Sequence, residues 1–281
     1  MLENKTKRTV KDTMFRAVFT EPIYFVDLYR ASSGEEIRPE DITPFSLSSD
    51  SVTRGISNDV SHLLLDERIL HLTEHQSLPN PNIVIREYLY SAELLRLYTT
   101  QRNIDLSGEN KIILPEPELY VAYMGKRKYP KEHLEYRTAK GHLHIKLSLV
   151  DINFDSLKEQ DPKDYLAGYA YFHKQMAIKY EEILFKQNIS KQAANTEAFE
   201  FAREQCMVKG YFLDFVRKED FVMVYAPIYD RDEELRAEGR YEERLKAITI
   251  MLKKGISIKD IADGFEVPLS TVEDLQKELA F

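Results

Sequence analysis

The sequence predicts an α/β fold with a helical C-terminal half, and three features of the chain support this prediction. Two runs of strand-like composition lie close together after residue 57, and two more follow beyond residue 110. A segment with helical spacing separates the two pairs, and apolar residues recur at helical intervals after residue 160. Because helices and strands alternate over the first 155 residues, the pattern indicates an α/β or α+β fold and not a helical bundle.

The N-terminal segment predicts a helix, a loop and then a β-hairpin. Apolar side chains recur at helical spacing over residues 10–19, and residues 30–52 are polar and mixed, which is typical of loop. Residues 58–65 and 68–76 both have strand character. The gap between them is short enough for a hairpin, although it lacks the favoured glycine.

One helix and two strands are expected next. The helix covers residues 83–100, with Ile85, Leu89 and Ala92 on one apolar stripe. Residues 111–125 and 142–154 are each rich in alternating, β-branched or aromatic residues, so each predicts a strand. Prolines in the first of these strands are expected at its start or edge.

Composition indicates a globular cytoplasmic protein. Hydrophobic residues make up 43% and charged residues 31%, no apolar run approaches the roughly 18 residues of a membrane helix, and no secretory signal opens the chain. The single cysteine, Cys206, suits a reducing compartment, and a buried structural role is expected for it. We therefore expect no membrane partner.

The net charge of −8 does not suit a dedicated nonspecific DNA-binding protein, because neutralising phosphates requires basic residues. Contacts with DNA would have to come from local basic clusters. The two candidates are Lys5, Lys7, Arg8 and Lys11, and Lys126, Arg127, Lys128 and Lys131. Solvated surface charge is the alternative interpretation of each cluster.

Three polar residues on the predicted hairpin suggest a metal site. Asp59 opens the first strand, and Glu74 and Gln76 share one face of the second because side chains alternate along a strand. Two carboxylates from adjacent strands, with a backbone carbonyl, are ligands that Mg²⁺ prefers. A solvated hairpin is the alternative, but Glu74 follows the apolar run ILHL, and a charge in such a strand needs a partner or a metal.

Several segments resemble the Rpn-like family of recombination-promoting nucleases and transposases, which belongs to the PD-(D/E)XK superfamily. The resemblance covers roughly residues 10–155. It is carried by Asn58-Asp59-Val60-Ser61, Glu74-His75-Gln76-Ser77, Asn80-Pro81-Asn82, Arg86 with Tyr90, the proline-containing strand ending in YMG, and KDTMFRAVF with Asp12 and Phe15.

The resemblance implies a PD-(D/E)XK, restriction-endonuclease-like core and a DNA endonuclease that depends on Mg²⁺ or Mn²⁺. In this assignment Asp59 and Glu74 are metal ligands and act in catalysis with Gln76. Gln76 stands where many members of the superfamily have a catalytic lysine, and a neutral amide cannot supply the positive charge of lysine.

Further site residues follow from the same resemblance. Asp12 could be the acidic residue supplied by the first helix, with a solvated helix-start acid as its alternative. Arg86 and Tyr90 lie four residues apart, hence on one helix face. Arg86 would contact a phosphate or a catalytic carboxylate, and an ordinary helix arginine is its alternative. His71 and His75 face away from Glu74 and are expected to be packed histidines, not zinc ligands.

Three parts of the chain are expected: a nuclease-like core over residues 1–155, a helical extension over residues 156–229, and a module over residues 230–281. The spacing of residues 256–275 is typical of a helix-turn-helix, but the second helix is acidic and would repel phosphate. We therefore expect this module to mediate self-association, giving a homo-oligomer, or docking on the rest of the chain.

Two hypotheses for function remain. The first is a metal-dependent DNA endonuclease that hydrolyses phosphodiester bonds in a recombination or mobile-element setting. The second is a protein that keeps the nuclease fold, cleaves weakly or not at all, and binds DNA or another protein. The acidic chain and the glutamine at position 76 favour the second hypothesis.

Overall fold

The structure is a computed structural model. It describes residues 10–47, 59–186, 190–219, 221–222, 231–265, 267 and 269–279. The chain divides into two compact units, Met1–Tyr229 and Asp230–Phe281. The basic residues Lys5, Lys7 and Arg8 lie outside the described residues.

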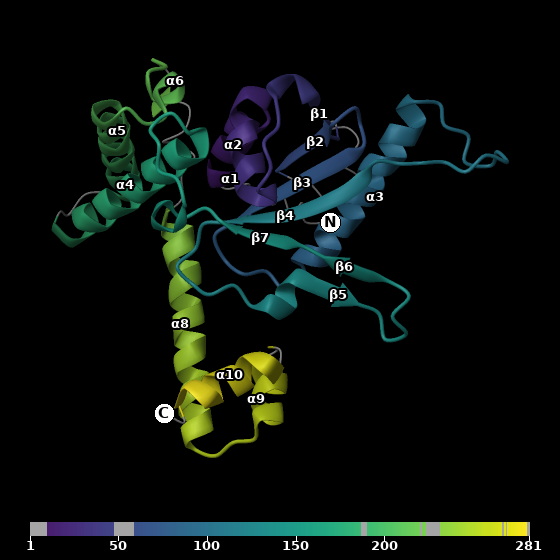
Figure 1. The fold of residues 1–281 in the computed structure, drawn as a ribbon. Coiled ribbons are helices and arrows are strands. Elements are labelled where there is room, and N and C mark those ends of the chain that lie inside the picture. The colour runs from purple at the N-terminus through teal and green to yellow at the C-terminus, as the bar shows by residue number, and fades with distance from the viewer. Residues whose placement is uncertain are drawn as a thin grey trace, which may run out of the picture. The chain divides into compact units, whose positions relative to one another are not determined.

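A five-stranded mixed sheet forms the centre of the first unit (Figure 1). Its strands, in spatial order, are β1 (Ile42–Pro44), β2 (Val60–Leu64), β3 (Ile69–Gln76), β4 (Glu116–Tyr123) and β7 (Ser148–Asp151). The first three strands are antiparallel, whereas β3, β4 and β7 are parallel. A parallel pair requires a crossover connection, and α3 (Ile83–Gln101) makes it between β3 and β4. The predicted α/β class is therefore confirmed.

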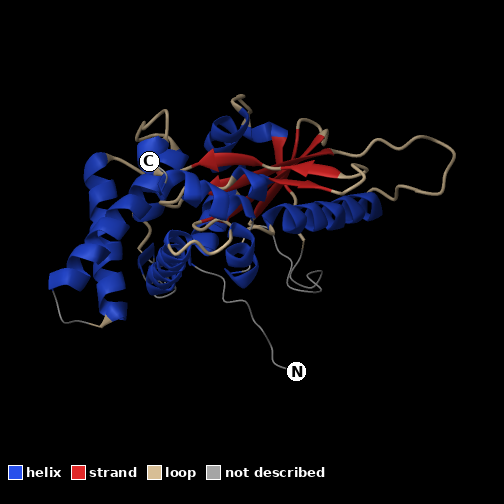
Figure 2. Ribbon diagram, turned by 90° about the horizontal axis from the view of Figure 1, so that it is seen from below, coloured by secondary structure: helices blue, strands red, loops and turns tan. Residues whose placement is uncertain are grey.

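Helices lie on both sides of this sheet, as Figure 2 shows. On one face, Leu70 and Leu72 of β3 pack against Leu94 of α3. On the other face, His75 stacks on Phe15 of α1 (Val10–Phe19), with ring centroids 4.9 Å apart. Alternate residues of β3 are thus buried against different helices, which explains why His71 and His75, like Glu74, are nearly inaccessible to solvent.

The predicted hairpin of β2 and β3 is confirmed, and its turn is formed without glycine. Leu65, Asp66 and Glu67 all have positive φ, between 53° and 62°, a conformation that costs about 1 kcal/mol or more per residue. The Glu67 carboxylate holds the turn, because it accepts hydrogen bonds from Tyr98 Oη of α3 at 3.1 Å and from Arg102 Nε, just after the end of α3, at 3.0 Å. These hydrogen bonds, chiefly that from Arg102, lower the pKa of Glu67.

Two elements lie in or beside the segment predicted as loop. Helix α2 (Pro22–Ser33) begins with a proline at its first position and ends at Gly34, whose φ is 78°. Strand β1 is only three residues long and pairs with β2 at the edge of the sheet. The loop prediction was wrong for Ala31, Ser32 and Ser33, which are helical, and for the residues of β1. An edge strand of three residues is too short to show a clear alternation of apolar and polar side chains.

The single strand predicted over residues 142–154 is in fact two strands in different sheets. The strand β6 (His144–Lys146) pairs with β5 (Glu135–Arg137) in a separate two-stranded sheet, and β7 joins the main sheet. Strand β4 matches its prediction, with its prolines at or near its start. The pattern of residues does not reveal the change of partner, because it reports strand character and not the identity of the neighbouring strand.

The predicted helix after the hairpin is confirmed, but the apolar stripe of Ile85, Leu89 and Ala92 is not its buried face. Leu89 is 43% exposed, whereas Ile83, Glu87, Tyr90 and Leu94 are buried. The buried stripe therefore contains an acidic residue. A stripe chosen for apolar side chains alone misses this face.

The predicted C-terminal helices of the first unit are also present. They are α4 (Tyr165–Lys186), α5 (Lys191–Lys209) and the short α6 (Leu213–Val216), and 3₁₀ turns occur at Pro39–Asp41, Lys131–Leu134 and Phe154–Ser156. Aromatic packing joins α4 to α5, with the rings of Phe172 and Phe199 4.8 Å apart. Cys206 is fully buried, and burial raises the pKa of its thiol to about 12, in agreement with a structural role.

The second unit contains three helices, α8 (Arg231–Lys253), α9 (Ile258–Phe265) and α10 (Leu269–Leu279). Their common core consists of Ile248, Ile261, Ala262 and Val272. A glycine and a serine make the break before α9: Gly255 has a φ of 74°, and Ser257 Oγ accepts a hydrogen bond from the Asp260 amide. Among the described residues, no helix is long and apolar enough to span a bilayer.

Candidate active site

Asp59 and Glu74 lie opposite each other where β2 and β3 meet at one end of the sheet. Val60 pairs with Thr73, so the next residues along the two antiparallel strands are Asp59 and Glu74. Asp59 Oδ2 accepts a hydrogen bond of 2.9 Å from the backbone amide of His75. The predicted juxtaposition of the two carboxylates on neighbouring strands is therefore present.

Glu74 is buried and is held by residues from two elements. Its Oε1 atom accepts hydrogen bonds from Arg86 Nη2 at 2.6 Å and from Gln76 Nε2 at 3.3 Å. Only 6% of the Glu74 side chain is exposed, against 40% for Arg86. Helix α3 begins at Ile83, so its first turn brings the guanidinium over the end of β3. The arginine compensates the cost of burying the carboxylate and fixes its orientation.

Glu87 is a further acidic residue beside this pair, and the sequence analysis missed it. It is 1% exposed and lies on the buried face of α3. Burial and, to a smaller extent, the negative charge of Asp59 raise the pKa of Glu87 to about 8, while Arg86 opposes the shift. Strongly shifted pKa values are common at functional sites. The one usable signal in the sequence was a glutamate at helical spacing with Ile83, Tyr90 and Leu94.

The two other residues suggested for the site are placed differently. Tyr90 is buried in the apolar cluster that contains Leu72 and Leu94, one helical turn beyond Arg86. Asp12 lies on α1, and its side chain is outside the described residues. The described part of α1 packs through Phe15 on the face of β3 that carries His75, whereas Glu74 and Gln76 point to the opposite face.

The end of strand β4 closes the site on its other side. Met124 donates its amide hydrogen to the Gln76 carbonyl at 2.8 Å, so β4 continues beside β3 past the carboxylates. A Cβ atom on Gly125 would collide with the Ser77 carbonyl and the Tyr123 ring, which explains the glycine of the Tyr-X-Gly sequence. Tyr129 lies nearby, and its pKa is raised by burial and, less strongly, by Glu74.

The two carboxylates of Asp59 and Glu74 fit a metal ion that takes most of its ligands from water and phosphate. Within the described ranges, no group of three or more His, Cys, Asp or Glu side chains is arranged to hold a metal. This excludes a closed site of the zinc type there, which needs four protein ligands. Mg²⁺ usually binds through one or two carboxylates and completes its shell with water and substrate phosphates, so Asp59 and Glu74 suffice for it.

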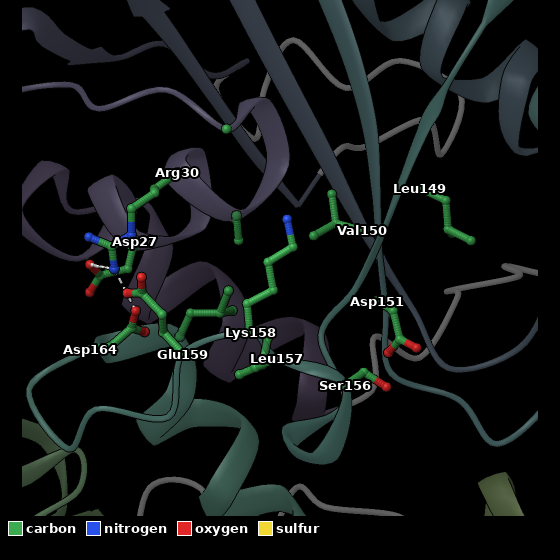
Figure 3. Close-up of a pocket in the computed structure, with 13 residues that line it drawn as sticks. Asp27, Arg30, Leu149, Val150, Asp151, Ser156, Leu157, Lys158, Glu159 and Asp164 are labelled. Atoms are coloured by element: carbon green, nitrogen blue, oxygen red, sulfur yellow. Dashed lines mark hydrogen bonds and ion pairs between the residues drawn. The ribbon is translucent and has the colours of Figure 1, made fainter.

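A separate cavity of about 350 Å³ lies away from these residues (Figure 3). Arg30 of α2 bridges two carboxylates at its rim, Asp27 at 3.0 Å and Asp164 at 2.6 Å. Asp27 also accepts a hydrogen bond from the Tyr165 amide at the start of α4, and burial raises the pKa of Asp27 to about 6. We interpret these contacts as a structural junction between α2 and α4.

The chain was compared with protein-family models, with curated proteins and with solved structures, and none of them matches it.

Proposed function

We propose that the chain is a DNA endonuclease of the Rpn-like type, with a PD-(D/E)XK core and dependence on Mg²⁺ or Mn²⁺. The observation that carries the proposal is the pair of opposed residues Asp59 and Glu74, with Glu74 held at 2.6 Å by Arg86. A pair of carboxylates at a strand end, with Glu74 buried and Asp59 partly exposed, next to an arginine and a second polar side chain, suits metal-assisted hydrolysis of a phosphodiester.

Each residue of the site has a distinct role in the proposed hydrolysis. Asp59 and Glu74 would hold the metal, which lowers the pKa of bound water and neutralises charge on the scissile phosphate. Arg86 holds Glu74 in position and, being 40% exposed, can also reach a phosphate oxygen. Gln76 keeps its amide beside Glu74, where it can orient water by hydrogen bonding, but it supplies no positive charge.

The alternative is a nuclease-fold protein that binds DNA or protein without efficient cleavage. One observation favours it: the Glu74 Oε1 atom already accepts hydrogen bonds from Arg86 and Gln76. A metal would have to share this carboxylate with a guanidinium.

A plasmid assay separates the two proposals. The purified protein is expected to convert supercoiled plasmid into nicked or linear forms with Mg²⁺ or Mn²⁺, and not with excess EDTA. Failure to nick with either metal, while circular dichroism shows a folded protein, would contradict the endonuclease and leave the binding alternative.

We also propose that the second unit makes the protein a homo-oligomer. Ile250 and Leu269 are 53% and 46% exposed in this unit, whose core is small. The double variant Ile250→Ser, Leu269→Ser is expected to lower the molar mass measured by light scattering while leaving DNA affinity nearly unchanged. A monomeric parent protein would refute this, and a large loss of DNA affinity would instead indicate a DNA-reading role for the acidic second helix.

A further inference from the structure

The segment between β4 and β7 has a charge opposite to that of the rest of the chain. Residues 126–146 contain seven Lys or Arg and two Glu. The segment contains no Asp, and the whole chain has 39 Lys or Arg and 47 Asp or Glu, so the remainder holds 32 basic and 45 acidic residues. A net charge of +5 within 21 residues, against −13 elsewhere, is an uneven distribution that needs a reason. A segment that only had to stay solvated would not need a net charge opposite to that of the rest of the chain.

This basic segment forms an arm outside the main sheet. The strands β5 and β6 pair only with each other, and Figure 1 shows them running beside the main sheet toward a separate tip. Lys128, Lys131 and Lys140 are exposed, and no carboxylate in the described part of the chain is within ion-pair distance of them. Tyr136 adds an exposed aromatic ring, 39% accessible, on β5.

The base of the arm is fixed next to the candidate active site. Tyr129, Ile145 and Leu147 pack with Ile83 and Val84 in one buried cluster. These two residues form the start of α3, three and two positions before Arg86.

The directions of the strands also place the base of the arm beside the candidate active site. Strands β3 and β4 are parallel and Gln76 pairs with Tyr123, so the arm leaves the sheet at the end that carries Glu74 and Gln76. Its lysines are therefore held on a scaffold rooted beside the carboxylates.

We propose that residues 126–146 bind the sugar-phosphate backbone of a nucleic acid and guide it past Glu74. This inference rests on the proposed function, because it names the surface by which that site would hold its substrate. Exposed lysines act as mobile point charges, which suit phosphates and carry no sequence information. An exposed tyrosine can add stacking on a base without selecting it. Binding through the arm is thus salt-dependent and independent of sequence.

The test compares two triple variants by fluorescence anisotropy on a labelled DNA duplex, in EDTA, over a series of salt concentrations. The first variant is Lys128→Gln, Lys131→Gln, Lys140→Gln. The matched control is Lys111→Gln, Lys163→Gln, Lys209→Gln, three exposed lysines outside the arm with the same loss of charge.

The arm variant is expected to bind at least about tenfold more weakly near physiological salt and to reduce the salt slope by roughly 2 to 3, because each lost phosphate contact removes about one unit. The control should bind like the parent. Equal affinity and slope in the arm variant and the parent would overturn the inference, even if the parent nicks plasmid. If the arm variant instead loses self-association in light scattering and keeps its DNA affinity, the inference is overturned, and the arm binds a second copy of this acidic chain.

The outcome is distinct from that of the cleavage assay. DNA binding that depends on the arm, in a protein that never nicks plasmid, would contradict the endonuclease proposal and support the role of the arm in DNA binding. Nicking that is unaffected in the arm variant would support the endonuclease proposal and contradict the role of the arm.

Discussion

Replacing Glu74 by glutamine is expected to reduce metal-dependent nicking at least about 100-fold. The amide keeps the size of the side chain and an oxygen that can accept the Arg86 hydrogen bond, but it removes the negative charge beside Asp59. Loss of several kcal/mol of charge stabilisation in the transition state corresponds to two or more factors of ten, at about 1.4 kcal/mol each. Initial nicking rates at saturating Mg²⁺ measure the effect.

Glu67→Gln provides the matched control for this change. Glu67 is also a glutamate of the β2–β3 hairpin and is bound by an arginine, Arg102 at the C-terminal end of α3, but it lies at the turn, at the other end of the strands from Glu74. Its substitution should affect stability and leave nicking nearly unchanged. If Glu74→Gln cuts plasmid as fast as the parent, the carboxylate pair is not the active site, whatever the control does.

The arrangement of Asp59, Glu74 and Gln76 could be predicted because it depends on short-range rules. Alternation along a strand puts Glu74 and Gln76 on one face, and a short hairpin brings the start of one strand to the end of the next. Arg86 was also suggested in advance, but by the resemblance to the Rpn-like family and not by a short-range rule. In the structure, Arg86 and Gln76 are indeed partners of Glu74, whereas Tyr90 belongs to the apolar core.

The residues that were missed depend on tertiary contacts that no local pattern contains. Glu87 lies on the buried face of α3, whose Tyr90 and Leu94 pack against β3, and a search for a purely apolar stripe does not select a face that contains an acid. The division of residues 142–154 between β6 and β7 depends on which strand lies alongside each part. In both cases the local secondary structure was predicted and the neighbour was not.

Glu87→Gln is expected to stabilise the protein, and the gain should grow as the pH rises. The folded protein holds the Glu87 proton up to a pKa of about 8, against an ordinary value of 4.5. Between these values the unfolded chain releases this proton while the folded protein keeps it. The free energy of unfolding therefore falls as pH rises, by up to about 1.4 kcal/mol per pH unit. This contribution is fully present below pH 4.5 and is lost as the pH passes 8.

Glutamine has no proton to release, so the variant lacks this contribution to the pH dependence. Its advantage over the parent should be small at pH 5 and reach a few kcal/mol at pH 8, as measured by urea unfolding in EDTA. Glu93→Gln, on the exposed side of the same helix, should follow the parent at both pH values. A Glu87→Gln variant that is less stable than the parent at pH 8 would show that the carboxylate is ionised and well compensated in the folded protein. A stabilising substitution that also slows nicking would identify Glu87 as an acid kept for function at the expense of stability.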